Sequence, residues 1–194
     1  KNLENANFTI DSIFNSFSAL FDMAQFYRYT ALQIFIGNRE FPGNNVKLWY
    51  DNKGQNPFRF ILYDTDLAQA SIWDYNYNTL YHLLSPEKLN CSNPPRSTIL
   101  WRKFFSNTTY KNSFLLTLSD ELNTHFSTPN YIRIIDSLTS IVENEMQDHR
   151  KRWQMITSDW NHEVQRLREF ATVRQDIVRQ QSIERFGLGG ICSV

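Results

Sequence analysis

Residues 35–68 constrain the fold of this chain more than any other segment, because they contain two strand-like runs separated by turn residues. The first run, Val46 to Tyr50, is β-branched and aromatic, and a second apolar run extends from Phe58 to Tyr63. The residues between them, Asp51 to Gly54, have the composition of a turn. The segment is therefore predicted to form a β-hairpin.

The two ends of this predicted hairpin carry polar side chains. In an antiparallel pair the first residue of one strand lies beside the last residue of the other, so we expect Asn45 close to Asp64. An amide oxygen and a carboxylate at one strand end are hard ligands that suit Mg²⁺ or Ca²⁺. Structural alternatives remain open: Asn45 is a common turn residue, and Asp64 and Asp66 can cap a helix that begins at Leu67.

Glu40 precedes Asn45 by five residues. An acid and an Asn have this spacing in the protein-kinase catalytic loop, where the acid accepts the proton of the substrate hydroxyl and the Asn binds a metal ion. A two-stranded connection then leads to a metal-binding Asp in kinases, as it leads to Asp64 here. Taken alone, an acid such as Glu40 is more commonly a solvated loop residue.

Two motifs in this segment, GNREFPGNNVKLW at residues 37–49 and YDTDLA at residues 63–68, resemble the signature of the CotH kinase family. These are atypical protein kinases of the spore-coat-protein-H type, with the approximate pattern GN-x-D-W-PGNN-x-K-x-W and then W/Y-D-x-D-x-A. Three later segments, DELNTHFS, IVENEMQDHRKRW and LREFATVRQDIVRQQ, resemble the family's helical tail. The resemblance extends over most of residues 20–186.

The resemblance implies an α+β fold that is mostly α, a protein-kinase-like C-terminal lobe. A small β-hairpin would carry the catalytic and metal loop, and a helical tail would follow. Residues 1–194 are expected to form a single domain. The 36 residues before Gly37 contain no Gly-rich or Walker-type phosphate loop, and their only Lys is Lys1. The nucleotide-covering N-terminal lobe of a kinase is therefore expected to be absent from this chain.

Residue by residue, the resemblance implies that Glu40 is the catalytic acid and that Asn45 and Asp64 bind the cofactor and its metal ion. Asp66 matches the family's second acid and is expected as a further metal ligand. The implied cofactors are ATP and Mg²⁺ or Mn²⁺. Glu40 departs from the family pattern, which has Asp, and Phe41 replaces Trp. This matters because a misplacement of about 1 Å can lower a rate on the order of 10²-fold.

The implied reaction transfers the γ-phosphoryl of ATP to a Ser or Thr hydroxyl of a protein, such as a Ser-rich coat or surface protein. The alternative is a catalytically inactive surface, coat or adhesion module that keeps the scaffold for binding. A spore-coat, cell-envelope or secreted location is favoured over a plain cytoplasmic one. The formal net charge of zero argues against a nucleic-acid partner. No apolar run reaches transmembrane length.

The remaining chain is expected to be largely helical. An apolar stripe from Ile13 to Ile34 predicts a helix that restarts at Asp22, and a helical turn is expected around residues 79–84. From Ile99 onward, further starts are predicted at residues 107–109, 127–129 and 158–159, with a stop at Gly187.

Other residues leave two interpretations open. Lys47 suits either an exposed strand face or a phosphate contact, and His149 either a helix surface or a hydrogen bond to the catalytic loop. Cys91 and Cys192 lack a zinc-type cluster, and a disulfide between them stays open. The sequons that begin at Asn7, Asn90 and Asn107 permit glycosylation in a secreted eukaryotic protein.

Overall fold

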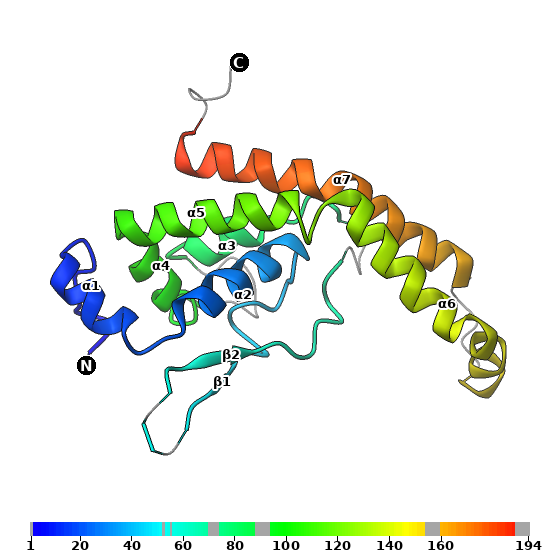
Figure 1. Cartoon of the computed structure of the whole chain (residues 1–194), viewed down its shortest axis with the longest axis horizontal. Coiled ribbons are helices and arrows are strands. Elements are labelled where there is room, and N and C mark those ends of the chain that lie inside the picture. Colours follow the sequence, from blue (N-terminus) through cyan, green and yellow to red (C-terminus); the bar gives the residue numbers. More distant parts are fainter. Residues whose placement is uncertain are drawn as a thin grey trace.

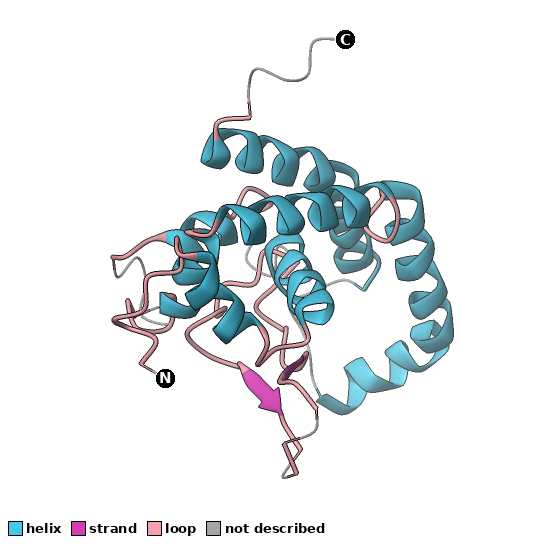
Figure 2. Ribbon diagram, turned by 60° about the vertical axis from the view of Figure 1, so that its left-hand side comes forward, coloured by secondary structure: helices cyan, strands magenta, loops and turns pink. Residues whose placement is uncertain are grey.

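The computed structural model describes residues 2–51, 53–54, 56–69, 74–87, 94–153 and 160–188. In these residues the chain is mostly helical with one small antiparallel sheet (Figures 1 and 2). The elements in chain order are α1 Asp11–Ser18, α2 Met23–Phe35, β1 Lys47–Trp49, β2 Arg59–Ile61, α3 Thr79–Leu84, α4 Ile99–Phe105, α5 Thr108–Asn123, α6 Thr128–Trp153 and α7 Trp160–Phe186.

Several predicted helix boundaries are confirmed, because local capping residues determine them. The Asp22 carboxylate accepts the Gln25 amide at 3.1 Å, which caps α2. The helical turn expected around residues 79–84 is α3, and α6 begins at Thr128 with Pro129 in its first turn. Gly187 has a φ of +66°, which ends α7 in the left-handed conformation that glycine adopts without strain.

Helix α2 occupies the centre of the main core, with the hairpin on one side and α5 on the other (Figure 1). Its Phe26 is fully buried, and the centroid of its ring lies 4.8 Å from that of Phe60 and 5.2 Å from that of Phe104. One polar pair is buried with them, since Trp101 Nε1 donates to Thr30 Oγ1 at 3.1 Å. Buried aromatic side chains therefore supply most of the apolar surface that this core removes from water.

The predicted β-hairpin is confirmed, with strands shorter than the sequence runs. Lys47 pairs with Ile61 and Trp49 with Arg59. A side chain of α2 completes the free edge of β2: Gln25 Nε2 donates to the Phe60 carbonyl at 2.8 Å, and the Phe60 amide donates to Gln25 Oε1 at 3.0 Å. The hairpin is thus fixed to the beginning of α2, which protects backbone groups that a two-stranded sheet leaves unpaired.

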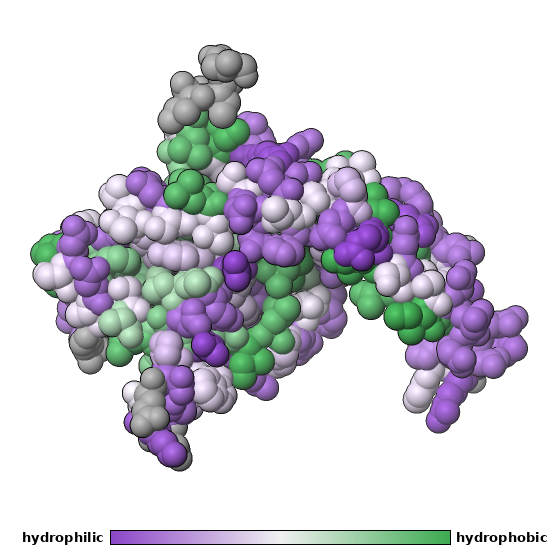
Figure 3. All heavy atoms as spheres, viewed as in Figure 1, coloured by the Kyte–Doolittle hydropathy of each residue, from purple (hydrophilic) through white to green (hydrophobic). Residues whose placement is uncertain are grey.

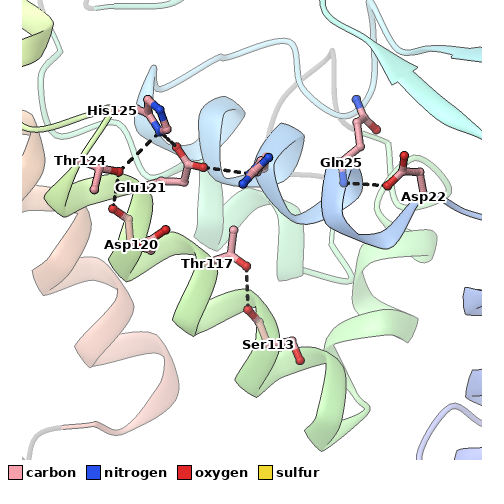
Figure 4. A network of polar contacts seen from close by, with 9 residues as sticks. Asp22, Gln25, Ser113, Thr117, Asp120, Glu121, Thr124 and His125 are labelled. Carbon is pink, nitrogen blue, oxygen red and sulfur yellow. Dashed lines mark hydrogen bonds and ion pairs between the residues drawn. The ribbon is translucent and has the colours of Figure 1, made fainter.

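A buried acid joins α2 to the end of α5 (Figure 4). Glu121 Oε1 lies 3.2 Å from Arg28 Nε, and its Oε2 lies 2.8 Å from His125 Nδ1. The side chain of Glu121 is only 7% exposed, so its charge is compensated by these two partners instead of by water. Glu121 continues the three- and four-residue spacing of the buried Tyr110, Phe114 and Leu118, so this acid belongs to the apolar stripe of α5.

Helices α6 and α7 form a long hairpin that extends away from the main body (Figure 1). Its own core is small and consists of Ile135, Val164 and Ala171. Apolar side chains stay accessible on the outside of α6, and Leu138 and Ile141 are 61% and 71% exposed; apolar spheres are visible along this hairpin in Figure 3. Among the described helices, none is both long enough and apolar enough to cross a bilayer.

Arg174 of α7 is fully buried and forms the centre of a polar junction. Its guanidinium donates to the carbonyls of Ile34, Phe35 and Tyr75, each at 2.7 Å. The first two carbonyls belong to the last turn of α2, where unpaired carbonyls carry the negative end of the helix dipole. Burial lowers the pKa of Arg174 to about 10, and the nearby Asp74 carboxylate opposes that shift, so the side chain remains protonated at neutral pH.

Some sequence expectations concern residues outside the described ranges. These are the pairing of Cys91 with Cys192, the sequon at Asn90 and the predicted helix start at residues 158–159. The sequon at Asn107 is described, and its side chain is buried: Nδ2 donates to the Phe8 carbonyl at 2.9 Å and Oδ1 caps α5. Glycosylation at Asn107 is therefore incompatible with this fold.

We predict that replacing Arg174 by Met lowers the free energy of unfolding by at least about 3 kcal/mol, because three carbonyls lose a charged donor and two of those bonds are buried. Lys in its place should recover only part of this loss, since one ammonium cannot reproduce a planar three-way contact. Urea unfolding followed by circular dichroism measures the effect. Arg179→Met is the control on the same helix; Arg179 is 40% exposed, and its loss should cost about 1 kcal/mol or less. Equal losses for the two variants would contradict the prediction.

Candidate active site

The site predicted from the sequence is built from two chain segments that lie side by side. The amide of Gln69 donates to the Ile36 carbonyl at 2.6 Å, and the amide of Arg39 donates to the Leu67 carbonyl at 3.2 Å. These two bonds hold the loop after α2 against the segment that follows β2. Residues that are far apart in sequence, Glu40 and Asp64, thereby belong to one site.

The entry to the loop has little conformational freedom. Gly37 has a φ of +64°, a backbone conformation that favours glycine, and it lies against Arg174 Nη2. The next residue, Asn38, is buried; its Nδ2 donates to Gln33 Oε1 at 2.8 Å and its Oδ1 accepts the Glu40 amide at 3.0 Å. Asn38 therefore fixes the position at which the Glu40 side chain begins.

The Glu40 carboxylate is held inside its own loop by two amides. Asn45 Nδ2 donates to Glu40 Oε2 at 2.7 Å, and Asn44 Nδ2 donates to Glu40 Oε1 at 3.0 Å. The backbone amide of Asn44 also donates to the Glu40 carbonyl at 2.9 Å. Both ends of the acid-x₄-Asn motif are thus in direct contact.

Asn45 lies close to Asp64, as the hairpin geometry predicted: Asn45 Nδ2 is 3.5 Å from the Asp64 carbonyl oxygen. The orientation of the amide differs from the expectation, because its nitrogen faces Glu40 and Asp64. The carboxylate of Glu40 attracts the NH₂ group, and the amide oxygen instead accepts a long, 3.4 Å bond from the Tyr63 hydroxyl. Asn45 and Asp64 both have positive φ values, 54° and 52°, which Asn and Asp tolerate better than most residues do.

Asp64 and Asp66 are exposed on the segment after β2. Asp66 Oδ1 accepts the amide of Leu67 at 3.1 Å, but residues 66–67 form a turn, so the alternative of a helix beginning at Leu67 is wrong. The oxygen donors are of the kind that Mg²⁺ uses when it binds one or two carboxylates together with substrate phosphates. The described residues contain no group of three or more His, Cys, Asp or Glu side chains able to hold a metal ion by themselves. The donor set fits a metal ion that is shared with a nucleotide.

Two cations lie near this site. Lys47 Nζ is 4.0 Å from the centroid of the Tyr63 ring, and Tyr63 in turn contacts Asn45, so Lys47 occupies an exposed strand face beside the site. Arg39 lies 2.8 Å from Asp74 and stacks over the Tyr77 ring at 4.3 Å. Burial and, secondarily, Arg39 lower the pKa of His82. His149, by contrast, is exposed near the far end of α6, in agreement with the helix-surface alternative.

The residues that sequence reasoning missed are those that support the site, above all Arg174. One signal in the sequence points to it. The buried residues of α7 include Phe170, Ala171 and Val178, and Arg174 has the same three- and four-residue spacing from them. A cation within the apolar stripe of a helix requires buried acceptors, and the C-terminus of α2 supplies two of them.

Comparisons with known proteins agree with the motifs. A family model described as CotH kinase protein matches residues 1–178, a range that includes both motifs, the hairpin and Arg174. No curated protein and no solved structure matches the chain. Because the matched range covers far more than half of the sequence, the chain belongs to the CotH kinase family.

Proposed function

We propose that this chain carries the phosphotransfer site of an atypical protein kinase, which transfers the γ-phosphoryl of ATP to a Ser or Thr hydroxyl. Family membership supports kinase chemistry in general. The observation that carries the more specific proposal is the Asn45 side chain, whose amide bridges the Glu40 carboxylate and the Asp64 backbone. A single residue thereby sets the distance between the proposed base and the proposed metal-binding segment.

In this proposal Glu40 orients the attacking hydroxyl and accepts its proton. Glu is one methylene longer than the Asp of the family pattern, so it must be drawn back if it is to take the same place. The hydrogen bonds from the Asn44 and Asn45 side chains hold the carboxylate within its own loop, so the longer side chain does not extend freely into solvent. This supports a catalytic role for Glu40 in spite of its length.

The metal ion, Mg²⁺ or Mn²⁺, would be held by Asp64, Asp66 and the amide oxygen of Asn45. When bound, such an ion neutralises the charge of the phosphates. The contact between Asn45 Nδ2 and Glu40 turns the amide oxygen away from the acid and leaves it with a long bond from Tyr63. Lys47, exposed on the same side of the hairpin as Tyr63, would contact a phosphate oxygen.

We further propose that residues 1–194 form one domain corresponding to the C-terminal lobe of a kinase. The hairpin and the loop after α2 would occupy the place of the kinase metal and catalytic loops. A coat or surface protein rich in Ser is the proposed substrate, in a spore coat, a cell envelope or a secreted setting. These assignments rest on the family resemblance.

A second function, a binding module without catalysis, is favoured by one observation. Both carboxylate oxygens of Glu40 already accept hydrogen bonds within their own loop. An acid used in this way stabilises the loop even if it never meets a substrate. The two proposals differ in what they require of Asp64, because only phosphotransfer needs its carboxylate.

Phosphotransfer from radiolabelled ATP, measured on the full-length protein with Mg²⁺ or Mn²⁺, tests the first proposal. We expect self-labelling, or labelling of a Ser-rich basic protein, to fall at least about 100-fold in Asp64→Asn and Glu40→Gln. Asp176→Asn is the matched control, since Asp176 is 85% exposed on α7, and it should label like the wild type. A folded wild-type protein that transfers no phosphate would favour the binding module.

Metal binding gives an independent prediction. The described residues form no cluster of three or more metal-binding side chains. Mn²⁺ should therefore bind weakly to the protein alone and at least about tenfold more tightly in the presence of ATP. Asp64→Asn should abolish this gain, and electron paramagnetic resonance of free Mn²⁺ measures it. Equally tight Mn²⁺ binding with and without ATP would contradict a shared metal ion and indicate a purely structural one.

A further inference from the structure

A concave site apart from the proposed catalytic loop, the basic pocket, lies where α4 and α7 end and α5 begins. It has a volume of about 510 Å³, and its main lining residues are Arg102, Phe105, Ser106, Lys111, Arg185 and Phe186. In Figure 1 the ends of these helices lie on the same side of the molecule, apart from the hairpin and the proposed catalytic loop. Among the residues that the structure describes, the lining contains three cations and no Asp or Glu.

Within the described part of the chain, the two arginines of the basic pocket donate to neutral partners. Arg102 donates to Thr98 Oγ1 at 3.0 Å and to the Pro95 carbonyl at 3.1 Å. Arg185 donates to the Leu84 carbonyl at 3.2 Å. The acid next to it on α7, Glu184, accepts from Gln180 instead.

Stabilisation by a helix dipole explains why Arg102 and Arg185 lie in the pocket, but it does not explain Lys111. Arg102 and Arg185 belong to the last turns of α4 and α7, where the helix dipole stabilises a cation. Lys111 belongs to the beginning of α5, where the dipole disfavours a cation, and the first turn of α5 contains no acid. Three positive side chains in one concavity repel one another, and one of them also opposes a helix dipole. A bound anion would offset both unfavourable interactions.

We infer that the basic pocket binds a phosphorylated Ser or Thr side chain of a polypeptide. Arg and Lys are the side chains that bind phosphate dianions, and the basic pocket presents three of them. The pocket is larger than one phosphate group requires. Phe105 and Phe186, stacked with centroids 5.7 Å apart, form an apolar floor for a side chain adjacent to the phosphoresidue. The proposed kinase activity is one source of such a ligand, but the binding itself does not depend on that activity.

Synthetic peptides test the inference without ATP and without phosphotransfer, so its failure is separate from any failure of the kinase proposal. A fluorescein-labelled peptide with phosphoserine flanked by Leu, its unphosphorylated form and inorganic pyrophosphate are titrated into the protein at about 150 mM salt, where surface charge is strongly screened. We expect the phosphopeptide to bind at least about tenfold more tightly than the unphosphorylated peptide. Lys111→Gln and Arg185→Gln should each remove most of this difference.

The control variant Lys151→Gln removes one charge from an exposed Lys of α6 and should leave phosphopeptide binding unchanged. Equal weakening by Lys151→Gln would mean general electrostatic attraction and would overturn the inference. Pyrophosphate that binds as tightly as the phosphopeptide would overturn the peptide assignment. Lys111→Gln is the decisive variant, because Lys111 lies on the surface of α5 and is only half-buried. The variant should therefore unfold at the same temperature as the wild type, so that any loss of binding reflects the missing charge. Absence of phosphopeptide binding in the wild type also refutes the inference.

Discussion

The rest of the site depends on the hydrogen bonds that the Arg174 guanidinium donates to three backbone carbonyls. A helix that ends inside a protein leaves carbonyls without partners, and such groups are costly to bury. Here the end of α2 is buried, and the loop that begins with Gly37 and Asn38 follows it directly. Arg174 satisfies two of those carbonyls and connects them to Tyr75, which follows the Asp64 segment. One planar cation therefore aligns the two halves of the site.

Within that frame, short-range polar contacts determine the geometry of the candidate residues. Asn38 fixes the backbone of Glu40, and Asn44 and Asn45 fix its carboxylate. The positive φ values of Asn45 and Asp64 place the two ends of the hairpin in a backbone conformation that most residues avoid. Such conformations persist only where surrounding contacts enforce them. The arrangement of acid, amide and carboxylate is thus held by the loop itself, before any ligand arrives.

Much of the fold could be predicted because its signals are local. Asp22, Thr128 with Pro129, and Gly187 mark helix ends through their own hydrogen bonds and backbone preferences, and all three are confirmed. The hairpin followed from two apolar, strand-like runs and the turn residues between them, and the proximity of Asn45 to Asp64 followed from the hairpin.

The interactions that could not be predicted are long-range. Arg174 and Glu121 each continue the apolar stripe of their own helix, but only the packing of α7 and α5 against α2 shows which partners their buried charges meet. The direction of the Asn45 amide also depends on a neighbouring charge, Glu40, which the strand pattern does not include. The roles proposed for Glu40, Asn45, Asp64 and Asp66 come from the family's motifs and not from folding signals.

The position of Arg174 in the chain has a consequence for protein synthesis. The last turn of α2 leaves the ribosome before the guanidinium that anchors it, because Arg174 is added 139 residues after Phe35. Until then the last carbonyls of α2 have no charged partner. The buried polar junction behind the site is therefore completed only after α7 has emerged and folded back onto α2.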